Sequence, residues 1–402
     1  MNVAGLVGLV LAHFLVGLTA AQGGCSRMVT RRDIMTLSQQ EWSQTASVLQ
    51  RMQNDGWFRI FAEIHNREFN NIHGNDNFFP WHRRFLRDFE EIGQRYDPNF
   101  AVPYWDELRD SRNPAGSPVL SSRLMGGNGF GGCVRDGLQQ GWTMSFPGPH
   151  CLVRRYDRGG QMQSWYSPEY IFSTMQRYND MHGLRENIEF TLHGSVHLGM
   201  GGDMSALYSS NDFVFFLHHA NLDRLWAQWQ SWGHQWTMDG RNHFGASIGL
   251  TSALPHYGDQ VGSTMQLGVN RMCFRYAGTG SRRRSESSLA LVSTPPGSNG
   301  ETRAQEGLQN LPLPILQKWF PALVNSSRDR APVSAAVAPK ANTTRSTIDT
   351  EQPAGHFLVY PAPLTNEWVN MHRFDRQKVA NTMEEAREFV DALNRAGYKS
   401  PY

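Results

Sequence analysis

Two amphipathic helices joined by a polar loop are predicted by residues 57–91, WFRIFAEIHNREFNNIHGNDNFFPWHRRFLRDFEE. Apolar side chains recur at helical spacing on both sides of the loop, so each helix is expected to bury one face. Three histidines lie in this stretch: His65 within the first helix, His73 in the loop and His82 at the start of the second helix. One histidine on an apolar helix is usually a hydrogen-bonded core residue, so no single one of them identifies a metal site.

A second group of three histidines lies further along the chain. His193 and His197 are four residues apart in EFTLHGSVHLG, so both imidazoles are expected on one face of a helix. His219 follows in FVFFLHHANLDRLWAQWQ. A zinc protease would need a glutamate directly after the first histidine of such a pair, and Gly194 stands there instead. Two groups of three imidazoles on helices with aromatic faces are hard to explain as packing, and they could hold a pair of metal ions that share a small ligand.

Helical periodicity continues over residues 36–276, which predicts a mainly α-helical catalytic region with long loops. The strongest segments are Trp42–Asn54, Trp57–Asn70, Phe79–Tyr96, Tyr170–Met181, Glu186–Leu198 and Phe213–Trp232. Beyond residue 276 the chain becomes rich in Ser, Gly and Arg, which is typical of an exposed linker. We therefore predict a catalytic domain over 22–276, a flexible linker over 277–355 and a small C-terminal region over 356–402 that ends in the helix Thr382–Ala396.

The overall charge excludes one large class of function. Lys and Arg number 38 against 36 Asp and Glu, and no basic block is present, so we expect no nucleic-acid partner. Aromatic residues make up 11% of the chain, which argues against disorder along its whole length.

The N-terminus and the cysteines predict secretion. Residues 4–21, AGLVGLVLAHFLVGLTAA, are uncharged and end in small side chains, so residues 1–21 are expected to be a cleaved signal peptide rather than a membrane anchor. Four cysteines fit two disulfides, with three possible pairings: Cys25, Cys133, Cys151 and Cys273. Two N-glycosylation triplets, which begin at Asn325 and Asn342, agree with an extracellular glycoprotein that does not stay in the membrane.

The segments around both histidine groups resemble the copper signatures of a known family. Eight residues separate His73 from His82, Arg83 follows directly, and Glu90 comes eight residues after the second histidine. The segment Asp212–Asp223 has a histidine four residues before its last aspartate. In these motifs the sequence resembles the tyrosinase family, the type-3 binuclear copper proteins that include tyrosinases, catechol oxidases and molluscan-type hemocyanins. The likeness is close over residues 57–232 and looser over 30–276.

The resemblance implies a four-helix bundle that binds two copper ions and uses O2 as a co-substrate. The ligands it implies are His65, His73 and His82 for the first ion, CuA, and His193, His197 and His219 for the second ion, CuB. The adjacent His218 is not chosen, because the family motif places the ligand four residues before Asp223.

Residues around the ligands are also assigned candidate roles. Asp223 and Asn221 are candidates to accept hydrogen bonds from the second ring nitrogens of the ligands. Glu189, one helical turn before His193, could orient a water that takes the proton of a phenol. A carboxylate placed to favour the helix N-terminus is an equally supported explanation of this glutamate. Phe215 is expected to pack near the site.

Two further positions bear on the choice of substrate. Gly194 stands where family members that hydroxylate monophenols often carry Asn, so the monophenol step is left open while diphenol oxidation is not affected. Ala206 aligns with a position over CuA that is bulky in some catechol oxidases. Its small side chain indicates an open pocket for a large or protein-bound phenol.

The predicted function is that of a secreted copper oxidase that converts o-diphenols, and monophenols such as tyrosine if the first step occurs, to o-quinones. The expected partners are small phenols or protein-bound tyrosine or DOPA. Two alternatives stay open: a hemocyanin-like protein that binds O2, and a catalytically silent protein of the extracellular matrix.

Overall fold

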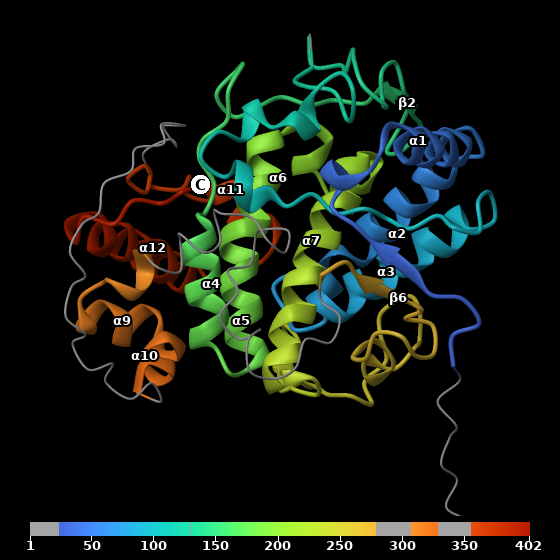
Figure 1. The fold of residues 1–402 in the computed structure, drawn as a ribbon. Helices are drawn as coiled ribbons and strands as arrows, with labels where there is room; N and C mark the ends of the chain where they lie inside the picture. The colour runs from blue at the N-terminus through green and yellow to red at the C-terminus, as the bar shows by residue number, and fades with distance from the viewer. Residues whose placement is uncertain (1–23, 130, 279–306, 329–354) are drawn as a thin grey trace, which may run out of the picture.

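The structure of the chain is a computed structural model that describes residues 24–129, 131–278, 307–328 and 355–402. The predicted signal peptide and the glycosylation triplet at Asn342 lie outside the described residues, as do the side chains of 325–328. Within them the fold is mainly helical, with long loops between the helices (Figure 1). None of the helices in the described ranges is both long and apolar enough to cross a membrane.

The predicted helices of the first 276 residues all form, with ends shifted by a few residues. They are α1 (Gln39–Asn54), α2 (Trp57–Ile72), α3 (Phe78–Gly93), α4 (Pro168–Arg177), α5 (Met181–Ile188), the π-helix η5 (Glu189–His193), α6 (Gly194–Met200) and α7 (Phe213–Trp229). Single-turn helices connect them: η1 (Ile34–Thr36), η2 (Glu107–Asp110), η3 (Pro114–Gly116), η4 (Pro118–Leu120), η6 (Gly202–Ser205), η7 (Ser209–Asn211), η8 (Gln230–His234) and η9 (Val261–Thr264).

Aromatic side chains fill the space between α2, α3 and α7. The Phe61 ring lies 5.1 Å from both Phe85 and Phe89, and Phe216 stacks on Phe89 at 3.8 Å. All four rings are buried, and each contributes roughly 2 kcal/mol or more when it leaves water. This packing fixes α2 and α3 side by side with α7 across them, which is the frame that carries the histidines.

Short strands and two disulfides fasten the loops. Strand β1 (Val29–Arg31) pairs in parallel with β6 (Phe274–Tyr276), β2 (Thr143–Met144) pairs with β3 (His150–Cys151), and β4 (Gly240–Arg241) pairs with β5 (Ser247–Ile248). Of the three possible disulfide pairings, the structure has Cys25–Cys273 and Cys133–Cys151. The first bond joins the segment before β1 to the residue before β6 and so links the two ends of the catalytic region.

The described residues after 306, which are 307–328 and 355–402, pack against the catalytic region. Residues 307–328, inside the predicted linker, form helices α9 (Leu313–Trp319) and α10 (Pro321–Arg328), because Trp319 and Phe320 bury their rings against the core. Helix α12 (Arg376–Arg395) begins six residues before the predicted helix, since the Asp375 side chain caps residues 377 and 378. Its Phe389 contacts Tyr170 of α4 at 5.4 Å.

Helix α11 (Asn366–Met371) lies between α6 and α12 (Figure 1), and its Asn370 accepts a hydrogen bond from Arg376 at the start of α12. It is preceded by an extended segment and followed by a tight turn into α12. The C-terminal region therefore contacts several elements of the catalytic region, among them α4, η5 and α6.

Candidate metal centre

The first histidine group comes together between α2 and α3. One ring nitrogen from each of His65, His73 and His82 lies within 4.8 Å of the others, and all three residues are at most 3% exposed. His65 projects from α2, His73 ends that helix and His82 lies in the first turns of α3. The short loop between α2 and α3 thus brings three histidines that are separate along the chain into one cluster.

Each ring of this first cluster donates its Nδ1–H to a main-chain carbonyl. The acceptors are Leu207 for His65 (2.7 Å), Phe69 for His73 (3.1 Å) and Phe78 for His82 (2.8 Å). A carbonyl oxygen can only accept, so the proton is fixed on Nδ1 and the lone pair on Nε2. The Nε2 atoms of His65 and His82 have no hydrogen-bond partner among the described residues.

The second cluster contains four histidines rather than three. Nitrogens of His193, His197, His218 and His219 lie within 4.8 Å of one another, and all four residues are buried. The π-helix η5 ends at His193 and α6 continues from Gly194, so the backbone widens by one residue just where the first of these rings is placed. His197 Nδ1 donates to the Met204 carbonyl. The adjacent residues His218 and His219 belong to α7.

His218 is the member that sequence reasoning set aside. Its Nδ1 lies 2.7 Å from Oε1 of Glu107, and Asn221 donates from Nδ2 to the other oxygen of the same carboxyl group. The Nε2 atom of His218 has no partner in the described part of the chain. The only signal in the sequence was its position next to His219, and its carboxylate partner lies 111 residues away.

The two clusters face each other. The rings of His82 and His219 stack at 4.2 Å with planes 8° apart, and His73 stacks on His193 at 5.5 Å. Phe215 packs against both groups, with its ring 4.9 Å from His65 and 4.2 Å from His219. One enclosed site therefore receives imidazoles from both halves of the helical frame.

Burial keeps these imidazoles neutral at physiological pH. It lowers the pKa of His65 to about 4 and that of His218 to about 3, and it holds the pKa values of the other cluster members well below the usual range. Neutral imidazole is the form that binds a metal. Buried polar nitrogens without partners are costly in a protein interior, so this many free ring nitrogens in one place fit a pair of metal ions bound by histidine.

Asp223 does not reach the ring of His219. Its carboxylate accepts hydrogen bonds from Arg83 Nε at 2.5 Å, Arg31 at 3.3 Å and the Tyr276 hydroxyl at 2.6 Å, while His219 Nδ1 has no partner among the described residues. Asp223 therefore does not form the expected hydrogen bond to His219. Two buried guanidinium groups hold this carboxylate more strongly than a neutral imidazole would.

Asn221 likewise forms its hydrogen bonds with residues other than His219. Its Nδ2 donates to Glu107, and its Oδ1 accepts from Arg224. Asn221 therefore fixes the carboxyl group beside His218 rather than the predicted ligand.

Glu189 lies next to the loop of the first cluster. One oxygen accepts from the Gly74 N–H at 2.7 Å, directly after His73, and the other accepts from Arg185 at 3.1 Å. Burial raises the pKa of this carboxyl group to about 7, although Arg185 opposes the shift. The carboxyl group ties η5 to the loop between α2 and α3, and its predicted role toward a water stays a prediction.

Ala206 belongs to a loop that touches both clusters. The carbonyl of Met204 accepts from His197, and that of Leu207 accepts from His65. The small side chain of Ala206 lies between these two acceptors in the chain and is partly exposed.

The C-terminal region covers the second cluster, which the sequence did not indicate. The Trp368 ring lies 5.4 Å from His197 and 6.0 Å from His193. A Cβ atom on Gly194 would lie only 2.4 Å from Cδ2 of Leu364 and 3.2 Å from Nε1 of Trp368. A side chain at position 194 would therefore require Leu364 to move and would crowd Trp368.

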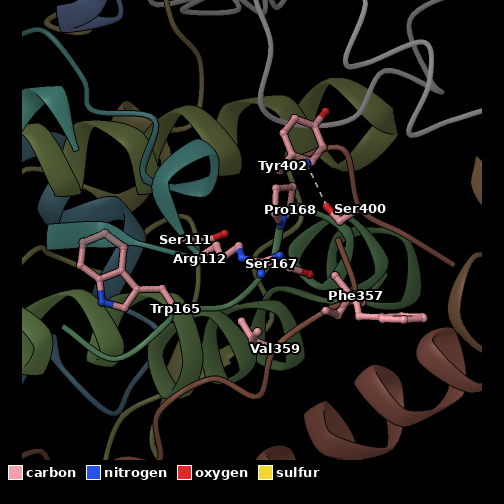
Figure 2. Close-up of a pocket in the computed structure, with 10 residues that line it drawn as sticks. Ser111, Arg112, Trp165, Ser167, Pro168, Phe357, Val359, Ser400 and Tyr402 are labelled. Atoms are coloured by element: carbon pink, nitrogen blue, oxygen red, sulfur yellow. Dashed lines mark hydrogen bonds between the residues drawn. The ribbon is translucent and has the colours of Figure 1, made fainter. Parts of the chain in front are cut away.

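A shallow pocket lies elsewhere, where the end of the chain meets the loop before α4. Figure 2 shows Trp165, Phe357 and Tyr402 around it, and no residue that lines it belongs to either histidine cluster. It is separate from the candidate metal centre.

Comparison with known proteins agrees with this arrangement. Residues 54–232 match the family model described as the common central domain of tyrosinase. Tyrosinase ustQ of Aspergillus flavus is 31% identical over 253 residues, which cover 55% of this chain and 69% of that protein. A tyrosinase of Streptomyces antibioticus is 30% identical over 229 residues, 50% of this chain and 83% of the relative. A polyphenol oxidase variant from Thermothelomyces thermophila shares the fold, with a TM-score of 0.51 at 20% identity over 62% of this chain and 88% of that one.

Proposed function

Because the chain belongs to the tyrosinase family, whose members bind a dicopper centre, and is an oxidoreductase of tyrosinase type, we propose that it oxidises o-diphenols to o-quinones with O2. The proposed ligands are His65, His73 and His82 for CuA, and His193, His197 and His219 for CuB. The observation that supports this most is the meeting of two groups of buried imidazoles across the contact between His82 and His219.

The bound copper ions would supply O2 activation and take up the two electrons that each diphenol gives. Two diphenols then lose four electrons and four protons, and one O2 becomes two waters. The residues of the chain keep the site dry and fix the ligand rings: Phe215 packs against rings of both clusters, and main-chain carbonyls hold His65 and His197.

Glu189 is proposed to handle the phenol proton through a water. Its carboxylate has two acceptor positions left after the bonds to Gly74 and Arg185. A pKa of about 7, raised by burial, suits a group that takes and returns a proton near neutral pH.

We propose that the natural substrate is a diphenol rather than a monophenol. The space beside Gly194, where related hydroxylating proteins often have Asn, is filled by Leu364 and Trp368. An amide that could help to deprotonate a monophenol is therefore lacking at this position.

Secretion remains part of the proposal. It is supported by the apolar N-terminal segment and by the two disulfides, Cys25–Cys273 and Cys133–Cys151, which form in oxidising compartments. Recovery of the chain from the medium of secreting cells, with a mature N-terminus near residue 22, tests it.

Oxygen uptake by the purified, copper-loaded chain tests the proposed activity. We expect uptake with an o-diphenol, little or none with the matching monophenol, and loss of uptake in His197→Ala. Equal uptake with both phenols would contradict the substrate proposal, and a chain that binds no copper would favour the silent matrix protein.

The choice of His219 over its neighbour is testable by copper content. His219→Phe is expected to retain one copper ion per chain. His218→Phe is expected to retain two, because its ring is held by Glu107. The reverse result would transfer the ligand role to His218.

One observation favours the O2-binding alternative. Leu364 and Trp368 lie over the second cluster, where they would hinder a phenol but not O2. Reversible O2 binding by the copper-loaded chain, without diphenol turnover even after the C-terminal region is removed by proteolysis, would establish that alternative.

A further inference from the structure

Lysine is confined to the last part of the chain. Of the 38 Lys and Arg residues only four are lysines: Lys318, Lys340, Lys378 and Lys399. Residues 1–317, which include the whole catalytic region, contain none, although lysine is among the commonest residues of soluble proteins. Arginine therefore supplies all permanent positive charge of the catalytic region. Lys340 lies outside the described residues.

Free thiols are absent as well. All four cysteines form the two disulfides, and no free cysteine remains. Thiolates and free amines are strong nucleophiles, whereas the guanidinium group of arginine stays protonated and offers no lone pair. The catalytic region thus lacks both kinds of side chain that add most readily to an electrophilic ring.

The product of the proposed oxidase is such an electrophile. The lone pair of an amine forms a C–N bond to a ring carbon of an o-quinone, and the ring electrons shift to its two oxygens. One proton from the nitrogen and one from the attacked carbon move to these oxygens. The result is an amino-substituted catechol, and no oxidant is consumed. A chain that releases quinone is itself exposed to this reaction.

Lys399 is the described lysine whose amine is most available. Its side chain is exposed, and it has no ion pair with a carboxylate among the described residues. Lys318 donates to Glu388 at 2.7 Å, and Lys378 donates to Glu186 at 2.8 Å. These two hydrogen bonds must break before either nitrogen can attack. Because exposed ion pairs are weak, they should slow the reaction several-fold rather than prevent it.

An exposed aromatic ring lies beside the amine of Lys399. The amine is 5.1 Å from the ring centre of Phe357, which is 51% exposed. Two main-chain hydrogen bonds of 2.8 Å between His356 and Ser400 hold the two segments together in this register. Phe357 also lines the shallow pocket near Tyr402 (Figure 2). A flat quinone ring that stacks on Phe357 comes within reach of the amine.

We propose that Lys399, beside Phe357, is a site of covalent addition to o-quinones, and that the lysine-free catalytic region escapes this modification. When the quinone belongs to a protein or a polymer, the same addition attaches the chain through its C-terminal region and leaves the metal centre free. The inference rests on the proposed function, which supplies the quinone, and it adds a modification site away from the copper ligands.

A quinone made without the enzyme tests the site on the full chain. We would add 4-methyl-o-benzoquinone, prepared with periodate and then freed from it, and locate the adducts by peptide mass mapping. Lys399 should react several-fold faster than Lys318 and Lys378. The reaction should be faster at pH 8.5 than at pH 7, because an ammonium group has no lone pair. Equal rates at the three lysines, or equally fast adducts at the exposed His256 of the catalytic region, would overturn the proposal.

Phe357→Leu removes the ring beside the amine and should slow the addition at Lys399 several-fold. Tyr360→Leu, a change at an exposed aromatic residue of the same segment, is the matched control and should leave the rate unchanged. Equal slowing in both variants, or in neither, would contradict the role of Phe357.

Arg123→Lys places an amine on the catalytic region, at an exposed arginine. Its new lysine should be modified by the added quinone, whereas Arg123 of the unchanged chain should not. A lysine at this position that stays unmodified would show that the absence of lysine does not protect the region.

The copper-loaded chain connects the site to the proposed activity. With a resin that carries an o-diphenol, the unchanged chain should become attached and resist washing in denaturant, and Lys399→Arg should be retained several-fold less. Failure to oxidise the diphenol, with normal addition of the prepared quinone, would refute the proposed function alone. Oxidation of the diphenol without addition at Lys399 would refute this inference alone.

Discussion

Hydrogen bonds to the protein orient every ring of the first histidine cluster, whereas in the second cluster they orient only some of the rings. All three rings of the first cluster donate Nδ1–H to main-chain carbonyls. In the second cluster His197 and His218 have partners, but both nitrogens of His193 and the Nδ1 of His219 have none among the described residues.

The difference follows from how each cluster is built. The first comes from two helices and the loop between them, so local backbone carbonyls are at hand for each ring. The second cluster takes its histidines from the π-helix η5, from α6 and from α7. Leu364 and Trp368 of the C-terminal region cover it. The second cluster is therefore expected to depend more on metal and on the C-terminal region for its final geometry.

Removal of one ligand from each cluster is expected to give the largest effect. His65→Ala and His193→Ala should each lower oxidase activity at least about a hundredfold, since both metal ions are needed. The copper ion left in His193→Ala should resist a chelator better than the one left in His65→Ala. Copper retention by the two variants checks this, and the opposite order would refute the comparison between the clusters.

Truncation of Trp368 is expected to act on the second cluster. The side chain is 4% exposed, so Trp368→Ala should lower the free energy of unfolding by about 3 kcal/mol. If the site is covered against phenols, diphenol oxidation should rise several-fold at the same time, as measured by oxygen uptake. Trp319→Ala, a change at a buried tryptophan outside the site, controls for instability, and a similar gain in that variant would contradict the covering role.

The copper-free chain should lose stability as the pH falls. Burial lowers the pKa of His65 to about 4 and of His218 to about 3, below the value near 6.5 in the unfolded chain. The unfolded state then binds more protons between these values, so each such histidine removes up to about 1.4 kcal/mol of stability per pH unit below 6.5.

Chemical denaturation from pH 7 to pH 4 measures this loss. We expect the single variants His65→Phe and His218→Phe to have a shallower slope than the unchanged chain. A slope that does not change in either variant would show that these rings are protonated or solvated in the folded protein.

Arg373→Gly is expected to have the smallest effect. The residue has φ 55°, so glycine should stabilise the turn after α11 by about 1 kcal/mol. The measurement is thermal unfolding of the copper-free chain, with Arg387→Gly as a control at an exposed position inside helix α12, where glycine should destabilise by about 1 kcal/mol. A loss of stability in Arg373→Gly would mean that the arginine side chain, not the backbone, holds the turn.

The sequence by itself determined the helical frame and which residues lie at its centre. Strong 3.6-residue periodicity marks α2 and α3, whereas α7 is apolar on nearly all sides because nearly all of it is buried, and local spacing predicts which histidines share a helix face. The motif positions resemble those of the tyrosinase family because ligand identity and spacing are local properties of the chain.

The tertiary structure alone decided how distant residues meet. It selected the disulfide pairing, drew Asp223 to Arg31 and Arg83 instead of to a ligand ring, and gave His218 its carboxylate from Glu107. It also brought Trp368 and His372 over the clusters. No periodicity in the sequence encodes these contacts, because each depends on which surfaces pack together and which buried charges find partners once the helices have formed.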